Sequence, residues 1–345
     1  MSFKSSSVTF EHVKKAYGSV LALNDFSVKI ENGEFVTLLG ASGSGKTTVL
    51  NLIAGFFRQT SGRILIGERE ISSLPPERRN LGVVFQHYSL FPMMTVAENV
   101  AYPLKMRRLN KDDISKRVTK ALETVRMSAF ADRLPKNLSG GQQQRVAFAR
   151  AIVYEPPVLL MDEPLAALDQ NLREELQSEI RDYHSQLGCT IIFVTHDQRE
   201  ALQLSDRVAV MHNGKMEQIG TPHDIYSRPN TRYIAEFIGK SNIFDAQRVG
   251  SDFFIPALGL SGSFKGSGSC AVIRPEKIEI SKYGSGQSGT IKKLTFLGDA
   301  SYVEADLDGH GLIIQISGDK GNNYKVGDQI KIKAKADDVV LTNAE

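Results

Sequence analysis

Residues 36–48 read VTLLGASGSGKTT, and this stretch decides the fold. Its first four residues form an apolar run, rich in β-forming side chains, which is typical of a short buried strand. Three glycines follow at positions 40, 43 and 45, and Lys46-Thr47-Thr48 then open a run that can continue as a helix. The spacing Gly40-x-x-x-x-Gly45-Lys46-Thr47 is the pattern of a phosphate-binding loop.

The residue types in this loop suit that chemistry. Glycine lets backbone N–H groups turn toward phosphate oxygens, and the start of the following helix offers unpaired N–H groups and the positive end of a dipole. We expect Lys46 to contact the outer phosphates and the Thr47 hydroxyl to bind Mg²⁺. A flexible Gly/Ser turn is the alternative, and the flanking strand and helix make it the weaker interpretation.

The composition is that of an ordinary globular protein. The 345 residues leave room for two or three domains, with 41% apolar and 23% charged residues. A net charge of +3, without a basic stripe, argues against nucleic-acid binding. There is no apolar signal core at the N-terminus and no run of about 18 apolar residues, and the isolated Cys189 and Cys270 fit a reducing compartment. We therefore expect a soluble, cytosolic protein of several domains.

Acidic and imidazole side chains follow two further apolar runs. Asp162 and Glu163 come directly after residues 158–161, and His196 comes shortly after residues 190–194. Open α/β sheets keep their sites at the carboxyl ends of such strands, and buried acids need partners. We expect Asp162 to belong to a Mg²⁺ shell and Glu163 to activate the attacking water. A lone histidine is more often a core or surface residue, but at this position His196 is a credible γ-phosphate sensor.

Residues 138–142, LSGGQ, open another helix in an unusual way. Ser139 and Gln142 have the spacing of a capping box, yet Gly140 and Gly141 occupy the first turn, where glycine costs helix stability. One interpretation is a cap that happens to hold glycines. The other is a helix start kept bare so that a phosphate can approach its backbone.

Three further features are left with two interpretations each. Tyr17, before Gly18, is either a turn aromatic or a surface on which adenine stacks. Gln86 is either an ordinary strand end or a metal ligand through its carbonyl oxygen. The apolar stretch 88–94 is either part of the core or a contact surface.

The patterning divides the chain near Lys240. Residues 7–30 alternate as an antiparallel ribbon, residues 95–137 have helical character with a cap at Asn110, and strands alternate with helices up to about residue 240, which predicts a parallel sheet. The remainder is rich in Gly and Ser and its apolar residues alternate, which predicts a small β-barrel or sandwich.

Taken together, these motifs resemble an ATP-binding cassette (ABC) subunit over about residues 7–240. The motifs are Tyr17, the loop at 40–47, Gln86, LSGGQ at 138–142, VLLMDE at 158–163, ALD at 167–169 and His196. The resemblance implies an α/β P-loop NTPase fold, with a RecA-like parallel sheet and antiparallel β and helical subdomains, the latter over about residues 90–155. Residues 241–345 resemble an appended all-β, OB-like or TOBE-like regulatory domain.

The resemblance also implies a role for each site residue. Tyr17 would stack on adenine, and Gln86 and Asp162 would complete the Mg²⁺ site with Thr47. Glu163 would be the catalytic carboxylate and His196 the switch residue. The phosphates would be held by Gly40, Ala41, Ser42, Gly43, Ser44, Gly45, Lys46, Thr47 and Thr48. The ATP site of a second copy would be completed in trans by Ser139, Gly140, Gly141, Gln142 and Asp169.

Within the family, the chain looks most like the ATPase subunits of bacterial nutrient importers. Its cofactors would be ATP and Mg²⁺, and its partners a second copy, two membrane permease subunits that dock at residues 88–94, and a periplasmic solute-binding protein; nucleic acid would not be a partner. It would lie peripherally on the cytoplasmic face of the inner membrane. The junction AEFIGKSNIF at 235–244 favours spermidine or putrescine as cargo. Ferric iron, phosphonate, thiamine, opine or sugar import, export, and a non-transport role are the alternatives.

Overall fold

The computed structural model describes residues 4–166, 168–263 and 268–344, so Ala167 of the ALD motif lies outside the described residues. The chain folds into two compact units that divide between Pro222 and His223. Each unit is described by itself. All of the site residues expected from the sequence lie in the first unit.

A six-stranded sheet forms the centre of the first unit, with the strand order β10-β9-β3-β8-β7-β6. The pairs β9–β3, β3–β8, β8–β7 and β7–β6 are parallel, and β10 pairs with β9 in the antiparallel sense. The predicted parallel sheet is thus confirmed. The strands are β3 (Phe35–Leu39), β6 (Gly82–Val84), β7 (Val158–Asp162), β8 (Thr190–Thr195), β9 (Arg207–His212) and β10 (Lys215–Gly220).

The sheet is buried on both faces because its strands are apolar at successive positions. In β3, Phe35 contributes to one hydrophobic core and Val36 to another. The same alternation occurs in β8, where Phe193 and Val194 belong to opposite cores. Continuous apolar runs are what a parallel sheet with two covered faces requires.

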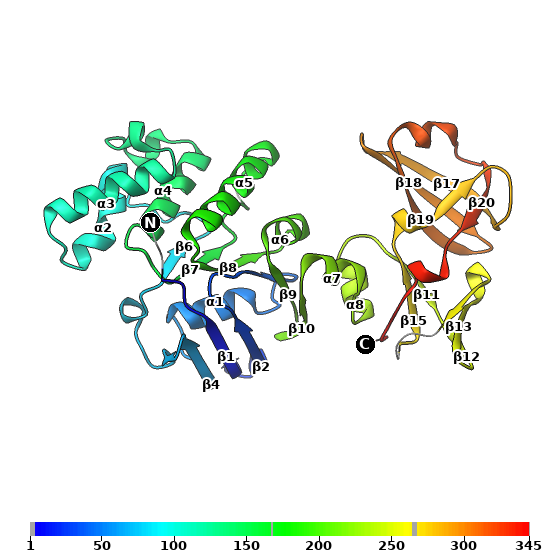
Figure 1. The fold of residues 1–345 in the computed structure, drawn as a ribbon, viewed down its shortest axis with the longest axis horizontal. Coiled ribbons are helices and arrows are strands. Elements are labelled where there is room, and N and C mark those ends of the chain that lie inside the picture. The colour runs from blue at the N-terminus through cyan, green and yellow to red at the C-terminus, as the bar shows by residue number, and fades with distance from the viewer. Residues whose placement is uncertain (1–3, 167, 264–267, 345) are drawn as a thin grey trace. The chain divides into compact units, whose positions relative to one another are not determined.

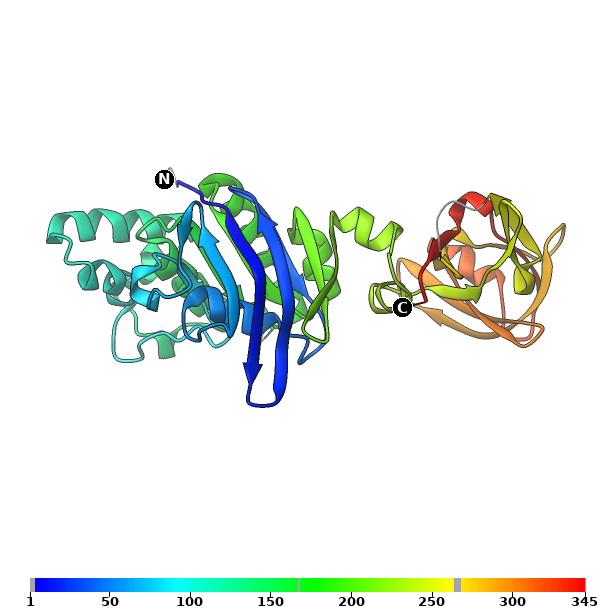
Figure 2. The same cartoon turned by 90° about the horizontal axis from the view of Figure 1, so that it is seen from below.

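One face is covered by α1 (Lys46–Ala54) and by a second, antiparallel sheet of order β2-β1-β4-β5. Figure 2 shows its two long strands, β1 (Val8–Tyr17) and β2 (Val20–Ile30), side by side and joined by a tight turn. The shorter strands are β4 (Ser61–Ile66) and β5 (Arg69–Glu70). The ribbon predicted for residues 7–30 is confirmed.

The other face carries helices, seen as a separate group in Figure 1. They are α2 (Val96–Met106), α3 (Lys111–Thr124), α4 (Gly140–Ile152) and α5 (Gln170–Leu187). Asn110 caps α3 as predicted, because its side chain accepts a hydrogen bond from the Asp113 N–H at 2.8 Å. The helical region predicted for 95–137 is interrupted between Met106 and Lys111, where Arg108 has a positive φ of 57°.

The second unit begins at the second residue of the short helix α7 (Pro222–Ser227), includes the short helix α8 (Arg232–Phe237), and continues as small antiparallel sheets around one hydrophobic core. The predicted all-β character of the C-terminal region is confirmed. Its strands are β11 (Asn242–Asp245), β12 (Gln247–Val249), β13 (Asp252–Ile255), β14 (Leu260–Ser263), β15 (Cys270–Ile273), β16 (Glu279–Ser281), β17 (Gln287–Phe296), β18 (Ala300–Leu307), β19 (His310–Ser317), β20 (Gln329–Lys333) and β21 (Val340–Thr342).

Arg274, directly after β15, joins the two short helices to these sheets. Its guanidinium is buried and stacks on the Tyr226 ring, with 4.1 Å between its central carbon and the ring centroid. It donates hydrogen bonds to the carbonyls of Ala235 (3.3 Å) and Ile238 at the end of α8, and to that of Tyr226 in α7. A cation at a helix C-terminus satisfies carbonyls that the helix itself leaves unpaired.

No helix within the described part of the chain is both long and apolar enough to cross a lipid bilayer.

Candidate functional site

The candidate site lies where the parallel strands of the first unit end. The register places Leu39 of β3 beside Thr195 of β8, and Val194 beside Asp162 of β7. The loop at 40–45 and the residues Glu163 and His196 therefore leave the sheet at one edge, as expected for an open α/β sheet. The order of the strands in the sheet thus brings together residues that are far apart in the sequence.

The loop between β3 and α1 needs glycine at defined positions. Gly45 has φ 104° and precedes the first helical residue, Lys46. A Cβ atom on Gly40 would lie 2.4 Å from the Met211 carbonyl oxygen, and one on Gly45 would lie 2.9 Å from that of Ala22. These positions exclude larger residues. Ala41, Ser42 and Gly43 are exposed, whereas Ser44 is buried.

Lys46 is held inside the loop. Its Nζ donates to the carbonyls of Gly40 at 2.8 Å and Ala41 at 2.9 Å. Burial lowers the pKa of Lys46, and the neighbouring carboxylates of Glu163 and Asp162 oppose that shift. The ammonium group therefore lies in the field of both acids that the sequence singles out.

The two adjacent acids differ in environment. Burial raises the pKa of Asp162, the Glu163 carboxylate raises it further, and the Lys46 ammonium lowers it in part. Glu163 has the positive φ of 43°, rare for a non-glycine residue, and its N–H donates to the Val194 carbonyl at 2.9 Å. The backbone of Glu163 is thus fixed to β8.

Glu163 and His196 are in direct contact. The Nδ1 of His196 lies 3.1 Å from Oε2 of Glu163, and the His196 side chain is otherwise exposed. A carboxylate paired with a solvent-facing imidazole can hold and orient a water molecule between itself and a reacting group.

The expected metal set contains a hydroxyl, an amide carbonyl and one carboxylate, from Thr47, Gln86 and Asp162. All are oxygen donors, which Mg²⁺ prefers, and a cation would offset the burial of the Asp162 carboxylate. Thr47 and Gln86 are exposed. Among the residues that the structure describes there is no cluster of three or more His, Cys, Asp and Glu side chains, so acid clustering alone does not reveal this set.

The LSGGQ segment begins α4 with the predicted capping box. The Ser139 Oγ accepts from the Gln142 N–H at 3.3 Å, and the Gln142 side chain accepts from the Ser139 N–H at 3.0 Å. A Cβ on Gly141 would lie 2.9 Å from Leu172 of α5, whereas one on Gly140 would meet only Leu168, at 3.4 Å. Gly141 therefore has a packing role, while Gly140 is exposed.

Asp169 and Tyr17 lie on other elements. The Asp169 side chain is exposed and caps α5 by accepting from the Leu172 N–H at 3.0 Å. Tyr17 ends β1 and is 41% exposed; its ring meets Phe57 edge to face at 5.8 Å, with the Lys15 Nζ 4.6 Å from the ring centroid. Phe57 comes close to Tyr17 only in the fold, whereas Lys15 lies two residues before Tyr17 on the same strand, β1.

Residues 88–94 divide between the two interpretations left open. Tyr88 belongs to the core, whereas Met93 is 87% exposed. Phe91 lines an apolar groove of about 780 Å³. Arg150 of α4 holds this segment by donating to the carbonyls of Tyr88 and Ser89, both at 2.7 Å. The other large apolar residues of the groove are Phe56, Phe85, Tyr102, Met106 and Tyr154.

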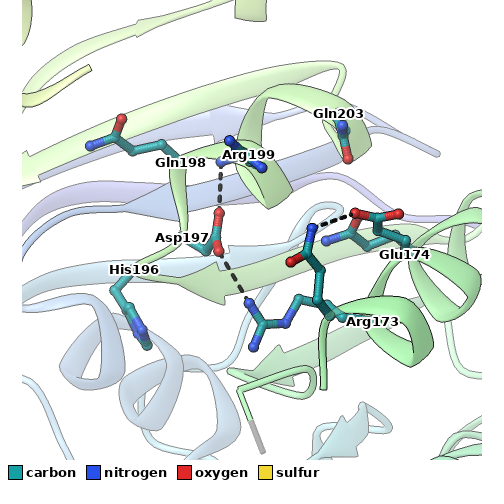
Figure 3. A pocket seen from close by; sticks show the side chains of 9 residues that line it. Arg173, Glu174, His196, Asp197, Gln198, Arg199 and Gln203 are labelled. Carbon is teal, nitrogen blue, oxygen red and sulfur yellow. Dashed lines mark hydrogen bonds and ion pairs between the residues drawn. The ribbon is translucent and has the colours of Figure 1, made fainter. Parts of the chain in front are cut away.

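A polar cavity of about 510 Å³ lies beside His196, between the first turns of α5 and of α6 (Gln198–Leu204). Figure 3 shows that Arg173 of α5 points toward Asp197, with which it forms an ion pair of 3.4 Å. Neither residue was singled out from the sequence, because Arg173 resembles an ordinary helix-surface charge and Asp197 resembles an ordinary helix N-cap.

Comparisons with known proteins agree with this geometry. Residues 23–166 match the family described as ABC transporter, and residues 271–341 match the TOBE domain family. The spermidine/putrescine import ATP-binding protein PotA of Hahella chejuensis (strain KCTC 2396) is 52% identical over 244 residues, which are 71% of this chain and 67% of that protein. The uncharacterized ABC transporter ATP-binding protein YdcT of Escherichia coli (strain K12) is 46% identical over 303 residues, 88% and 86% of the two chains.

Solved structures are similar to the chain as well. A dimeric, post-hydrolysis state of the ATP-binding cassette MJ0796, bound to ADP and Pi, has a TM-score of 0.56 at 33% identity and covers 62% of this chain and 98% of its own. The structure of cbiO1 from Clostridium perfringens, part of the ABC transporter complex cbiONQ, has a TM-score of 0.60 at 31% identity and covers 65% and 91%.

Proposed function

The chain belongs to the ATP-binding subunits of ABC transporters and is an importer ATPase with a TOBE domain, and from this premise we propose that it drives polyamine uptake. The support for spermidine or putrescine is the 52% identity to a protein named for their import. The support for the catalytic assignment is the contact between Glu163 and His196 at the sheet edge that also carries the phosphate-binding loop.

In the proposed reaction, Lys46 and the N–H groups of residues 40–48 hold the phosphates of ATP. Thr47, Gln86 and Asp162 would hold Mg²⁺, which would neutralise phosphate charge when bound. Glu163 accepts a proton from the attacking water, and His196 holds the γ-phosphate and the Glu163 carboxylate in place. Tyr17 stacks on the adenine ring, for which its exposed position next to Lys15 is suited.

A second copy completes each site in this proposal. Ser139, Gly140, Gly141, Gln142 and Asp169 of one copy contact the nucleotide of the other. The exposed backbone of Gly140 and the start of an α-helix suit an approaching phosphate. The neighbouring cassette structure bound to ADP and Pi is dimeric, which supports this arrangement.

The apolar groove beside Phe91 is the proposed docking site for the permease subunits. An exposed apolar groove lined by aromatic side chains suits a protein contact surface. The transporter would also include a periplasmic solute-binding protein, and the chain would lie peripherally at the inner membrane.

The test is ATP hydrolysis by the complex purified with its native membrane partners in lipid vesicles. Putrescine, spermidine, Fe³⁺, phosphonates and thiamine are added in turn, each with its binding protein. Stimulation by a polyamine alone supports the proposal, and stimulation by another cargo refutes the polyamine assignment. Glu163→Gln in the same complex controls for contaminating ATPases.

A further inference from the structure

We propose that Arg173 and Glu200 are positioning residues, which hold the loops of Glu163 and His196 in place relative to each other through a strap of charged and polar side chains. The strap consists of Arg173, Thr195, Asp197 and Glu200. The inference rests on the proposed function, because it assigns these residues to the hydrolysis carried out by Glu163 and His196. Neither Arg173 nor Glu200 is expected to touch ATP.

Glu200 is the buried end of the strap. It lies on the first turn of α6 and is 2% exposed. Its Oε2 accepts a hydrogen bond from the Thr195 Oγ1 at 2.6 Å, and the same Thr195 oxygen accepts from the Asp197 N–H at 3.0 Å. Of the residues on either side of His196, Thr195 therefore bonds directly to the buried Glu200 carboxylate, and Asp197 is linked to that carboxylate through the Thr195 hydroxyl.

Arg173 connects this group to the loop that follows Glu163. From α5, its Nη2 donates to the Leu168 carbonyl at 3.0 Å, and its Nη1 donates to Oδ2 of Asp197 at 3.4 Å. Its Nε is buried without a hydrogen-bond partner and lies 3.8 Å from Oε1 of Glu200. Figure 3 shows the guanidinium directed from α5 toward Asp197, with His196 on the adjoining turn.

The placement of these charges is hard to explain by fold stability alone. The Glu200 side chain is 3% exposed and that of Arg173 is 29% exposed, and the attraction within such a pair is largely offset by the desolvation of its buried member, so an apolar pair of similar volume would stabilise the fold as well or better. A guanidinium differs from an apolar side chain because its planar group donates hydrogen bonds in fixed directions, and here it donates to two loops at once. Here the two loops are those that position Glu163 and His196, so we infer that the strap sets the distance between them.

The experiment measures ATP hydrolysis by the full chain in its purified transporter. Glu200→Gln keeps the size of the side chain and an oxygen that can accept from Thr195, but it removes the charge facing Arg173. Arg173→Leu removes the guanidinium and its hydrogen bonds to Leu168 and Asp197. Each is expected to lower kcat about 10- to 100-fold while the KM for ATP changes less than about twofold, since displacement of a catalytic group by about 1 Å can lower the rate by up to about 100-fold. Arg173→Lys, which keeps the charge, should recover part of the kcat.

Two controls make the result specific. Arg199→Ala alters an exposed basic residue of the same helix turn as Glu200 and should leave kcat and KM unchanged. The double variant Arg173→Leu/Glu200→Gln should lose no more kcat than the worse single variant, because both changes break the same strap.

Several results would overturn the inference. They are an unchanged kcat in both single variants, additive losses in the double variant, or losses that follow thermal stability and are not recovered by Arg173→Lys. A wild-type transporter without ATP hydrolysis would overturn the proposed function itself, whereas active wild type with unaffected variants would overturn the strap alone.

Discussion

Replacing Arg274 is expected to disorder the first residues of the second unit. Arg274 is 7% exposed, and Arg274→Leu would fill similar space without any donor. The burial of this guanidinium lowers its pKa, and Tyr226 and Glu276 oppose the shift, so the group is charged at neutral pH. Its hydrogen-bond acceptors are the carbonyl oxygens of Tyr226, Ala235, Ile238 and Lys240 and the Oγ of Ser241.

The cost follows from those acceptors. A buried carbonyl left without a donor costs about 1–3 kcal/mol, and breaking a buried charged network typically costs about 3–5 kcal/mol in all. We take about 3–5 kcal/mol for Arg274→Leu, which is a large part of the stability of a domain. For a unit of this size the melting temperature should fall by about 10–20 °C.

Two measurements on the full chain check this. Calorimetry should show a lower melting temperature for the second unit, and hydrogen exchange should become much faster in residues 232–238, whose carbonyl ends Arg274 caps. Arg232→Gln is the matched control, because its pairing with Glu236 is exposed and worth at most about 0.5 kcal/mol. Unchanged exchange in α8, or a loss no larger than that of the control, would refute the reasoning.

Three further predictions concern the first unit. Glu163→Gln should bind ATP with unchanged affinity, hydrolyse it at least about 100-fold more slowly and accumulate as a dimer with ATP, which gel filtration and phosphate release measure; normal turnover would rule Glu163 out as the base. Burial raises the pKa of the Cys189 thiol to about 11 from its ordinary value near 9.0. The folded state therefore keeps this proton at pH values where the unfolded chain loses it. The contribution of the neutral thiol to folding stability is complete below pH 9 and is lost as the pH rises through 11. Denaturant unfolding between these pH values should lose up to about 3 kcal/mol, and Cys189→Ala should remove that part of the slope; an identical slope in the variant would contradict the assignment. Met106→Glu in the apolar groove should reduce copurification of the permease while ATP binding persists, and intact assembly would place the docking surface elsewhere.

The parts of the fold that local sequence determines could be predicted. The strand, loop and helix around Lys46 are contiguous, the cap at Asn110 needs only four residues, and the capping box of Ser139 and Gln142 is written in one turn. The strand-end positions of Glu163 and His196 follow from the general rule for parallel sheets. Their contact at 3.1 Å depends on β7 and β8 being neighbours, which strand order decides.

The parts that depend on distant residues could not be predicted in the same way. Arg173 and Glu200 look like helix-surface charges until α5 and α6 are placed side by side. Arg274 follows a short apolar strand, and nothing near it in sequence indicates the two helices it caps, whose acceptor carbonyls on Tyr226 and Ile238 lie 48 and 36 residues earlier. The sequence alone also left residues 88–94 undecided, because Tyr88 enters the core while Met93 remains exposed.

The packing of Gly141 against Leu172 affects how mutants of the LSGGQ segment should be read. A methyl group at Gly141 would lie 2.9 Å from the end of the Leu172 side chain, which would have to shift, so reduced activity of Gly141→Ala would combine altered packing against α5 with any altered nucleotide contact. Gly140 has room for that methyl group beyond an ordinary contact with Leu168, and Gly140→Ala is therefore the cleaner probe of the helix start. Activity of the Gly140→Ala variant therefore reports mainly on the nucleotide contact, whereas activity of the Gly141→Ala variant also reports on the packing of α4 against α5.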